Sequence, residues 1–256
     1  MTFHDWCAAK SAGPLSSEIS ALSDRKIQLL TAAFLRRVWE YLPSHHTQLA
    51  VEATERFADA RMTKVPLARI RVNDALESSE PLWFAADPSW PAASWYDEYR
   101  RWGNDLPAVY EQRAADLERR TANYGHVLQC VKAGIDWPHW VAAKVAFFAR
   151  ELRGWHAPIN QRVTASAREA AAQFKLFHEI GGDSSRPDAE WPRWRTGDVR
   201  ALARGIHRDQ AFDRLPILAD ALQDAGCDHE LVLEHCRRPG GHARGCWVVD
   251  LAMGIT

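Results

Sequence analysis

Residues 196–254 have the sequence TGDVRALARGIHRDQAFDRLPILADALQDAGCDHELVLEHCRRPGGHARGCWVVDLAMG, which carries the strongest signal for the fold. Acidic residues precede the apolar runs of this stretch, and glycine or proline follows them. Such residues are typical of helix starts and helix ends, respectively. We therefore expect helices over residues 198–206 and 213–225, a third helix between Asp228 and Pro239, and a short apolar helix over residues 246–253. A helix is favoured over a buried strand for the last segment, because no partner strand is evident.

The rest of the chain shows similar helical periodicity. The predicted helices cover residues 23–42, 46–62, 66–76, 107–134, 138–154 and 160–180. Alternating β-branched residues, which would indicate strands, are scarce throughout. The sequence therefore predicts an all-α fold, as a helical bundle or a short irregular solenoid. No regular repeat period identifies a named repeat class.

The predicted helices group into distinct parts of the chain. Residues 1–22 have weak periodicity, and we expect a flexible N-terminus there. Residues 23–180 form the predicted helical body, which a tryptophan- and proline-rich connection interrupts at residues 78–106. A linker over residues 181–197 leads to a C-terminal helical block at residues 198–256, which contains a cluster of cysteine, histidine and glycine.

Tryptophan is unusually abundant, with twelve copies in 256 residues. Many of them lie in proline-bearing stretches: Trp83, Trp90, Trp95, Trp102, Trp137, Trp191 and Trp194. Because each indole buries a large apolar area, we expect these side chains to pin the connections onto the helical body. An aromatic groove for a ligand or a peptide is the alternative.

The bulk composition is ordinary for a soluble globular protein, with 46% hydrophobic and 25% charged residues. A net charge of −1 does not favour a nucleic-acid partner, because such proteins usually carry a clear basic excess. There is no signal-peptide pattern and no apolar run long enough for a membrane helix, so no membrane partner is expected. Five dispersed cysteines suit reduced thiols, and we expect a cytoplasmic protein.

Three cysteines and one histidine of the C-terminal block have a spacing typical of metal sites. Cys227, Cys236, His242 and Cys246 follow the pattern C-x8-C-x5-H-x3-C. This spacing resembles that of the CCCH zinc-finger family, C-x8-C-x5-C-x3-H, with the last two ligand types exchanged. Three thiolates and one imidazole can hold Zn²⁺ tetrahedrally, so a structural zinc is a candidate cofactor. The nearby histidines, His229 and His235, are possible substitute ligands.

An ordinary packing role is the alternative for these cysteines. Cys236 shares a predicted helix face with Val232 and Leu233, where a small thiol packs like an apolar residue. RNA-binding CCCH fingers also stack bases on aromatic residues among their ligands, and none lies between Cys227 and Cys246. The spacing alone does not decide between zinc ligands and core residues.

A basic, glycine-rich turn overlaps the same stretch. The candidate residues for binding an anion or a partner are Arg237, Arg238, Gly240, Gly241, Arg244 and Trp247. Glycines let backbone N–H groups point at an anion, and arginine can donate two parallel hydrogen bonds to a carboxylate or phosphate. A solvated basic turn, with glycines present for backbone reasons, is the alternative.

Motifs of the easily recognised enzyme classes are missing. The sequence has no Walker A loop, no G-x-G-x-x-G, no G-x-S-x-G and no H-E-x-x-H. Glu52, Glu55 and Asp59 lie at helical spacing near His45 and His46, but di-metal bundles also need a Glu-x-x-His element, which the chain lacks. We therefore expect a solvated acidic face there.

Two stretches resemble an uncharacterised family of bacterial proteins that is abundant in planctomycetes. The first is SDRKIQLLTAAFLRRVWEYLP followed by AVEATERFADA, and the second is ARGIHRDQAFDRLPILADALQDAGC with EHCRRPGGHARGCWVVDLAMG. Members of that family often carry cysteines in the first helix, where this chain has Ala32, Ala33 and Phe34. The resemblance implies a bacterial cytoplasmic protein and supplies no activity.

The sequence as a whole favours a non-enzymatic helical scaffold or protein-interaction module, with a protein as the expected partner. A zinc-stabilised module that binds an anionic ligand or RNA is the alternative. A third option is an enzyme in which Cys236 or Cys246 acts as nucleophile and His235 or His242 as base. No sequence feature identifies a catalytic residue or a reaction.

Overall fold

The computed structural model describes residues 1–9, 12–41, 45–59, 138–183 and 185–255. These residues form α-helices and short 3-10 helices, and no strand occurs among them, which confirms the all-α fold. The chain divides into two compact units, one of Met1–Arg37 with Pro138–Thr256 and one of Val38–Trp137. None of the described helices is long and apolar enough to cross a membrane.

The second unit is described only near its start. It contains the 3-10 helix η1 (Trp39–Tyr41) and the helix α4 (His45–Ala58), which covers most of the predicted helix over residues 46–62. The predicted helices over residues 66–76 and 107–134, and the tryptophan-rich connection between them, lie outside the described residues.

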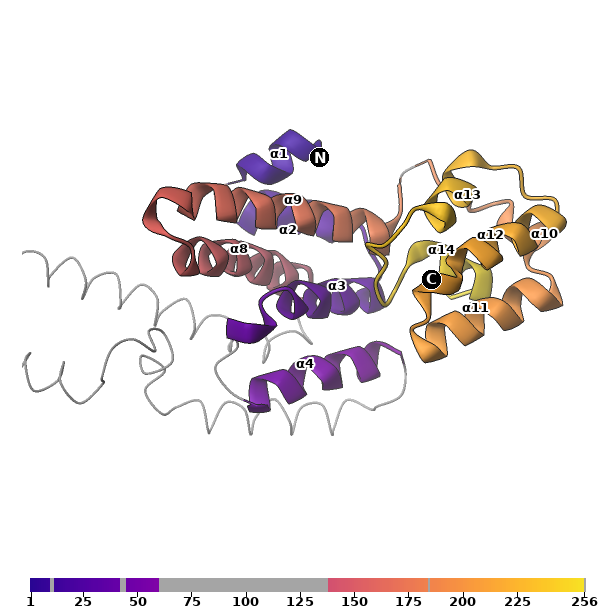
Figure 1. Ribbon diagram of the computed structural model, residues 1–256, viewed down its shortest axis with the longest axis horizontal. Coiled ribbons are helices and arrows are strands. Elements are labelled where there is room, and N and C mark those ends of the chain that lie inside the picture. The colour runs from indigo at the N-terminus through magenta and orange to yellow at the C-terminus, as the bar shows by residue number, and fades with distance from the viewer. Residues whose placement is uncertain (10–11, 42–44, 60–137, 184, 256) are drawn as a thin grey trace, which may run out of the picture. The chain divides into compact units, whose positions relative to one another are not determined.

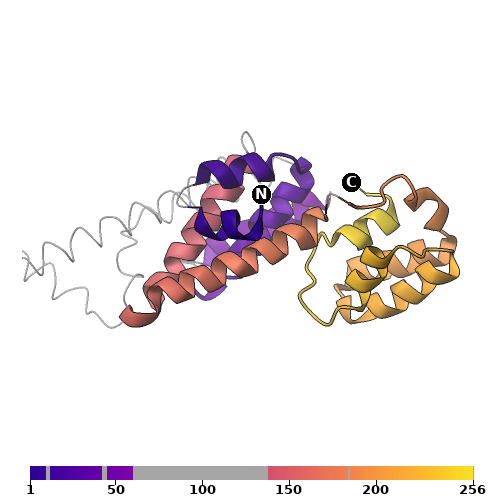
Figure 2. The ribbon, with the colours of Figure 1, turned by 90° about the horizontal axis from the view of Figure 1, so that it is seen from above.

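Five helices of the first unit form a bundle (Figure 1 and Figure 2). They are α1 (Phe3–Ala8), α2 (Ala12–Ile19), α3 (Asp24–Arg36), α8 (Pro138–His156) and α9 (Arg162–Gly181). Helix α8 packs against α2, α3 and α9, and α1 packs against α9. The buried face of α8 is rich in alanine, and these small side chains let its neighbours approach closely.

The helix bounds differ from the predicted ones mainly at the ends. The predicted helix over residues 23–42 stops earlier, because α3 ends at Arg36. Helix α8 begins at Pro138 as predicted but continues past the expected end at Gly154 to His156, and a 3-10 turn, η3 (Ile159–Gln161), precedes α9. Gly182 follows α9 with a φ of 80°, a conformation that ends helices and favours glycine.

The N-terminal segment is helical and docked, in contrast to the flexible terminus that we expected for residues 1–22. Helix α1 begins with a capping box, in which Thr2 and Asp5 each accept the other's backbone N–H. Trp6 is completely buried, and its ring centroid lies 5.9 Å from that of Phe174 and 5.1 Å from that of Phe177. One aromatic anchor thus docks a segment whose periodicity is too weak to predict it.

Six short elements form the C-terminal block of the first unit. They are α10 (Trp191–Trp194), α11 (Gly197–Asp209), η4 (Phe212–Arg214), α12 (Leu215–Asp224), α13 (Glu230–Arg237) and α14 (Trp247–Met253). Their apolar side chains share one hydrophobic core. The last predicted segment is a helix, as expected, and it packs against α11.

Part of the predicted linker over residues 181–197 belongs to this core. Trp191 and Trp194 are 0% and 1% exposed, and their ring centroids lie 5.6 Å apart. The ring of Trp191 also lies edge-on to that of Trp247, at 6.5 Å. These two indoles pin the connection to the helices, as we expected of tryptophan in proline-bearing stretches.

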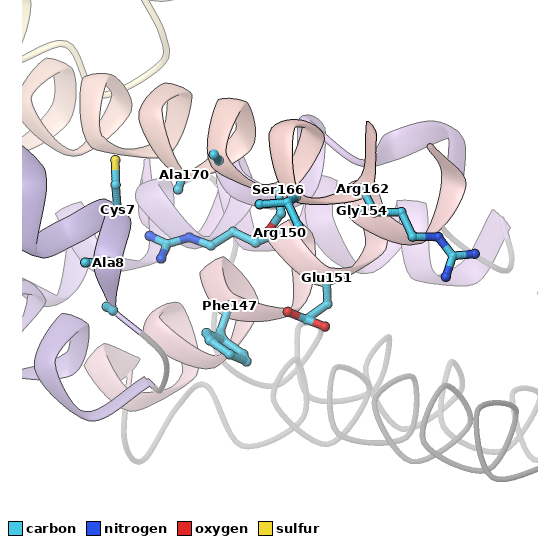
Figure 3. A pocket seen from close by; sticks show the side chains of 12 residues that line it. Cys7, Ala8, Phe147, Arg150, Glu151, Gly154, Arg162, Ser166 and Ala170 are labelled. Carbon is cyan, nitrogen blue, oxygen red and sulfur yellow. The ribbon is translucent and has the colours of Figure 1, made fainter. Parts of the chain in front are cut away.

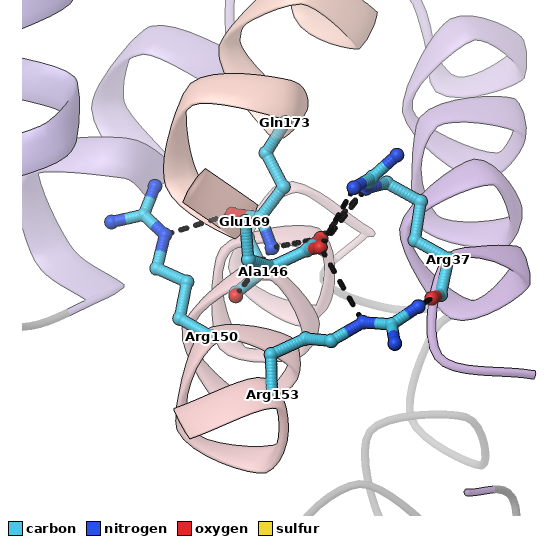
Figure 4. A network of polar contacts seen from close by, with 6 residues as sticks. All are labelled: Arg37, Ala146, Arg150, Arg153, Glu169 and Gln173. Atoms are coloured by element: carbon cyan, nitrogen blue, oxygen red, sulfur yellow. Dashed lines mark hydrogen bonds and ion pairs between the residues drawn. The ribbon is translucent and has the colours of Figure 1, made fainter. Parts of the chain in front are cut away.

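A polar network joins α3, α8 and α9 inside the bundle (Figure 4). Arg37 donates hydrogen bonds of 2.9–3.1 Å to both carboxylate oxygens of the buried Glu169. Gln173 donates to Glu169 and to the carbonyl oxygen of Ala146, and its own Oε1 accepts a hydrogen bond from Arg150. The charge of Glu169 is therefore compensated within the bundle.

A second buried carboxylate joins α3 to α14. Asp250 is 1% exposed, and it accepts hydrogen bonds from Arg25 at 2.6 and 3.2 Å and from Lys26 at 2.5 Å. Lys26 is buried as well, and its Nζ donates to the carbonyl oxygen of Gly245 at 2.7 Å. Burial lowers the pKa of Lys26, and attraction to Asp250 opposes that effect. Separating the C-terminal block from the bundle would leave Lys26 and Asp250 without their partners. Because an unpaired buried charge is costly, this ion pair holds the two parts together.

The substitution Asp250→Asn should therefore destabilise the protein strongly. It leaves the buried Lys26 without a counter-charge, which costs about 3–5 kcal/mol. Asp220→Asn is the matched control, because Asp220 pairs with Arg237 at the surface and its side chain is 72% exposed. That pair is worth at most about 1 kcal/mol. Urea unfolding measures both variants, and equal losses of stability would contradict the structural role of Asp250.

The backbone at Gly245 packs closely against Leu29, and this leads to a second prediction. A Cβ on Gly245 would lie 2.8 Å from Cδ1 of the buried Leu29, whereas a Cβ on Gly226 would have no atom within 4 Å. Both glycines have a positive φ, 87° and 86°. Gly245→Ala and Gly226→Ala should share a backbone cost of about 1–2 kcal/mol, and overpacking should add about 1–3 kcal/mol to Gly245→Ala alone. Thermal unfolding compares the two variants directly. A smaller loss of stability in Gly245→Ala than in Gly226→Ala would contradict this prediction.

Candidate metal centre

Four side chains from separate parts of the first unit converge at the end of α9. Glu179 lies in the last turn of α9, His235 in α13, His242 in the following loop and Cys246 at the N-cap of α14. One ligand atom from each residue lies within 4.8 Å of the other three. This set forms the candidate metal centre.

The individual distances show how tightly the set is drawn together. His235 Nε2 lies 3.1 Å from Cys246 Sγ and 3.5 Å from Glu179 Oε2. His242 Nδ1 lies 3.2 Å from Glu179 Oε1. Ligand atoms around a tetrahedral Zn²⁺ are about 3.3–3.8 Å apart, given bonds of about 2.0–2.3 Å. These three contacts lie near that range, and all four ligand atoms lie within 4.8 Å of one another.

The centre is buried. The side chains of Glu179, His235 and His242 are 1%, 8% and 3% exposed, and Cys246 is 1% exposed. Burial raises the pKa of Glu179, but hydrogen bonds from the two histidines outweigh it and hold that pKa at about 2. Arg238 adds a hydrogen bond of 2.9 Å to Glu179 Oε2 from the outside. Glu179 is therefore ionised, and Arg238 and the two histidines compensate its charge.

His242 is oriented as metal-binding histidines usually are. Its Nε2 lies 3.0 Å from the carbonyl oxygen of Arg238. A carbonyl oxygen only accepts, so Nε2 carries a proton and donates it. Nδ1 lies 3.2 Å from Oε1 of Glu179, which also accepts, so Nδ1 donates to the carboxylate and would exchange that proton for a metal ion. A ligating histidine typically donates its other N–H to such an oxygen.

His235 has the opposite arrangement. The indole Nε1–H of Trp247 donates to its Nδ1 at 3.1 Å. Because an indole nitrogen cannot accept, Nδ1 has the lone pair and Nε2 carries the proton of a neutral ring. That proton points to Cys246 and Glu179, which satisfies the network with protein groups alone. Coordination through Nε2 requires the proton to move to Nδ1 and Trp247 to release its bond.

The thiol of Cys246 is protonated in this network. Burial raises its pKa well above the usual value, and the carboxylate of Glu179 raises it further. A thiol in this setting is a poor nucleophile. A bound metal ion reverses that effect, because a coordinating thiol loses its proton.

The donor set suits Zn²⁺ in chemistry and in number. Carboxylate, imidazole and thiolate are all zinc ligands, and four of them complete a tetrahedron. The four groups converge on one point, but coordination requires His235 Nε2, His242 Nδ1 and the Cys246 thiol each to give up a proton. The described residues can therefore hold a metal ion at this point.

The structure brings together two of the four ligands that the cysteine spacing indicates. His242 and Cys246 belong to the centre, with Glu179 and His235 in the other two places. Cys227 and Cys236 do not belong to it, and like Cys246 they lie in the hydrophobic core of the block. Burial is the main cause that raises the pKa of Cys236 to about 12. Both thiols therefore have the apolar surroundings expected of core residues, which is the role that the helix periodicity indicates.

The basic turn is largely engaged within the protein. Arg237 donates to Asp220 and Gln223, and Arg238 donates to Glu179. Trp247 is 4% exposed and contacts His235 rather than solvent. Gly240, Gly241 and Arg244 lie in the loop between α13 and α14. Anion binding by this set stays a prediction.

Glu179 is the member that the sequence reading missed. It lies far from the cysteine cluster in sequence, at the end of a helix that looks complete without it. One signal could have found it: a carboxylate in the last turn of a helix opposes the helix dipole. Glu179 directly precedes Ile180 and the Gly181–Gly182 pair, so its position calls for a compensating partner elsewhere.

The chain matches no family model, no curated protein and no solved structure. The resemblance to a bacterial family therefore stays a prediction.

The hydrogen bond from Trp247 makes a prediction that is independent of any metal. In protein treated with a chelator, His235 should be the Nε2–H tautomer, because Nδ1 accepts from the indole. Long-range nitrogen–proton NMR correlations identify the tautomer. Trp247→Phe removes the donor, so the preference of His235 should weaken in that variant. An Nδ1–H tautomer in the unmodified chain would be incompatible with this arrangement.

Proposed function

We propose that the protein is a non-enzymatic helical interaction module whose C-terminal block is locked onto α9 by a structural zinc ion. Glu179, His235, His242 and Cys246 would be the ligands. The observation that carries this proposal is the closed, buried set of four ligand atoms within 4.8 Å. Catalytic zinc sites usually keep one position for water or substrate, whereas structural sites fill all four with protein groups.

The positions of the ligands support a locking role. Glu179 belongs to the bundle, whereas the other three residues belong to the C-terminal block. A metal ion held by all four would join the two parts, close to where Lys26 and Asp250 join them. Since a preformed site is absent from the unfolded chain, the binding energy of the metal would add to the stability of the fold.

The chemistry of the thiols does not favour the enzyme alternative. Cys236 is completely buried, and burial raises its pKa to about 12. A nucleophilic cysteine needs a lowered pKa and access to solvent. Neither Cys236 nor Cys246, whose pKa burial also raises, therefore suits the nucleophile of that alternative.

Metal analysis of the purified protein tests the proposal. Elemental analysis should find about one equivalent of zinc per chain, and stripping it with a chelator should lower the melting temperature. His242→Gln and Cys246→Ser should each reduce the zinc content at least about tenfold, because each removes one of four ligands.

Cys236→Ser is the matched control for Cys246→Ser. Both residues are buried thiols, but only Cys246 belongs to the centre. The Cys236 variant should keep its zinc. Loss of zinc from Cys236→Ser together with retention in a Glu179→Gln variant would favour the ligand set of the cysteine spacing. Zinc below about a tenth of an equivalent in the unmodified chain would end the metal proposal.

A further inference from the structure

A separate pocket of about 720 Å³ lies among α1, α8 and α9 (Figure 3). This volume is in the range of small-molecule sites. Much of its wall is apolar, with Ala8, Phe147, Val163 and Ala170 among the lining residues. Arg150 also lines it and is only 3% exposed, so the pocket has one deeply buried cation.

The charge of Arg150 has no carboxylate partner among the described residues. Its Nε donates to Gln173 Oε1 at 2.8 Å, and its Nη1 donates to the carbonyl oxygen of Trp6 at 3.1 Å. Both acceptors are neutral. Its Nη2 is buried and has no hydrogen-bond partner in the described part of the chain. Burying a charge in this way is costly, so a bound anion would supply what the site lacks.

The carboxylate of the neighbouring polar network does not fill this role. Glu169 accepts hydrogen bonds from Arg37 and Gln173, and it acts on Arg150 only through space. Burial lowers the pKa of Arg150 to about 10, while Cys7 and Glu169 oppose that effect. The guanidinium thus keeps its positive charge at neutral pH.

The pocket favours a monoanion with an apolar body. A single unpaired Nη group suits one carboxylate better than a phosphate dianion, which needs several donors. Glu151 and Arg162 also line the pocket, and because their charges are opposite they add no net positive charge to that of Arg150. In Figure 3 the guanidinium of Arg150 extends toward Cys7 and Ala8, whereas the carboxylate of Glu151 lies apart from it, near Phe147. The anionic head of a ligand can therefore reach Arg150 without meeting Glu151.

We propose that this pocket binds a small organic carboxylate. The carboxylate group pairs with the guanidinium of Arg150, and the apolar body contacts Phe147 and the alanines of the wall. Cys7 lines the same end of the pocket and is half-buried. Its rate of alkylation should therefore respond to a ligand bound in the pocket.

Ligand-observed NMR with the full chain tests the proposal. The probes are benzoate and hexanoate, with benzamide and hexanamide as neutral counterparts and phenyl phosphate as the dianion. The carboxylates should bind at least about tenfold more tightly than the amides, because a hydrogen bond to a charged group is the stronger kind. They should also slow the alkylation of Cys7, measured by mass spectrometry.

Two variants connect binding to the pocket. Ala167 is exposed and lines the pocket, so Ala167→Trp fills the space without changing the buried network, and carboxylate binding should fall at least about tenfold. Arg168→Gln on the same helix is the control, because Arg168 is exposed and does not line the pocket. Arg150→Met should abolish the preference for carboxylate over amide, provided that its circular dichroism shows it folded.

The proposal is overturned if amides bind as well as carboxylates, if Ala167→Trp binds like the unmodified chain, or if no carboxylate binds up to about 10 mM. Tighter binding of phenyl phosphate would overturn the assignment to carboxylates. Because the Ala167 variant leaves Arg150 in place, the test holds even if Arg150→Met fails to fold.

Discussion

The buried carboxylate of Glu179 is the constraint on which the candidate centre depends. It lies at the end of α9, where the helix dipole disfavours a negative charge, and it is removed from solvent. His235, His242 and Arg238 compensate it, and all three come from the C-terminal block. The carboxylate of Glu179 on the bundle therefore forms polar contacts with three side chains of the block. Asp250 makes the reciprocal contact, from the block to Arg25 and Lys26 of the bundle.

Compensation of buried charges also explains why the two proposed sites differ. Glu169 and Glu179 are both buried on α9, and each has cationic partners that hold it. Arg150 is the buried cation without such a partner among the described residues, and it faces a pocket rather than a packed interface. A compensated charge stabilises the fold, whereas an uncompensated one beside a pocket is available to a ligand.

Local sequence patterns predicted the helices of the described residues well, because apolar periodicity and glycine at helix ends are local signals. They failed where a single long-range contact decides the structure. Trp6 docks a segment of weak periodicity. The expected packing of Trp191 and Trp194 is confirmed, but local patterns assigned both to a linker rather than to the core of the block. Three members of the centre were named from the sequence, with His235 as a substitute ligand. His242 and Cys246 are near neighbours in sequence, whereas Glu179 reaches them only through the packing of α9 against the block.

The most direct test of the account is X-ray absorption spectroscopy of the zinc-loaded protein at the zinc edge. The ligand set proposed here predicts one sulfur neighbour at about 2.3 Å and three nitrogen or oxygen neighbours at about 2.0–2.2 Å. The alternative set of Cys227, Cys236, His242 and Cys246 would give three sulfur neighbours and one nitrogen. A spectrum with three sulfur neighbours, or a protein that binds no zinc to measure, would contradict the centre built around Glu179.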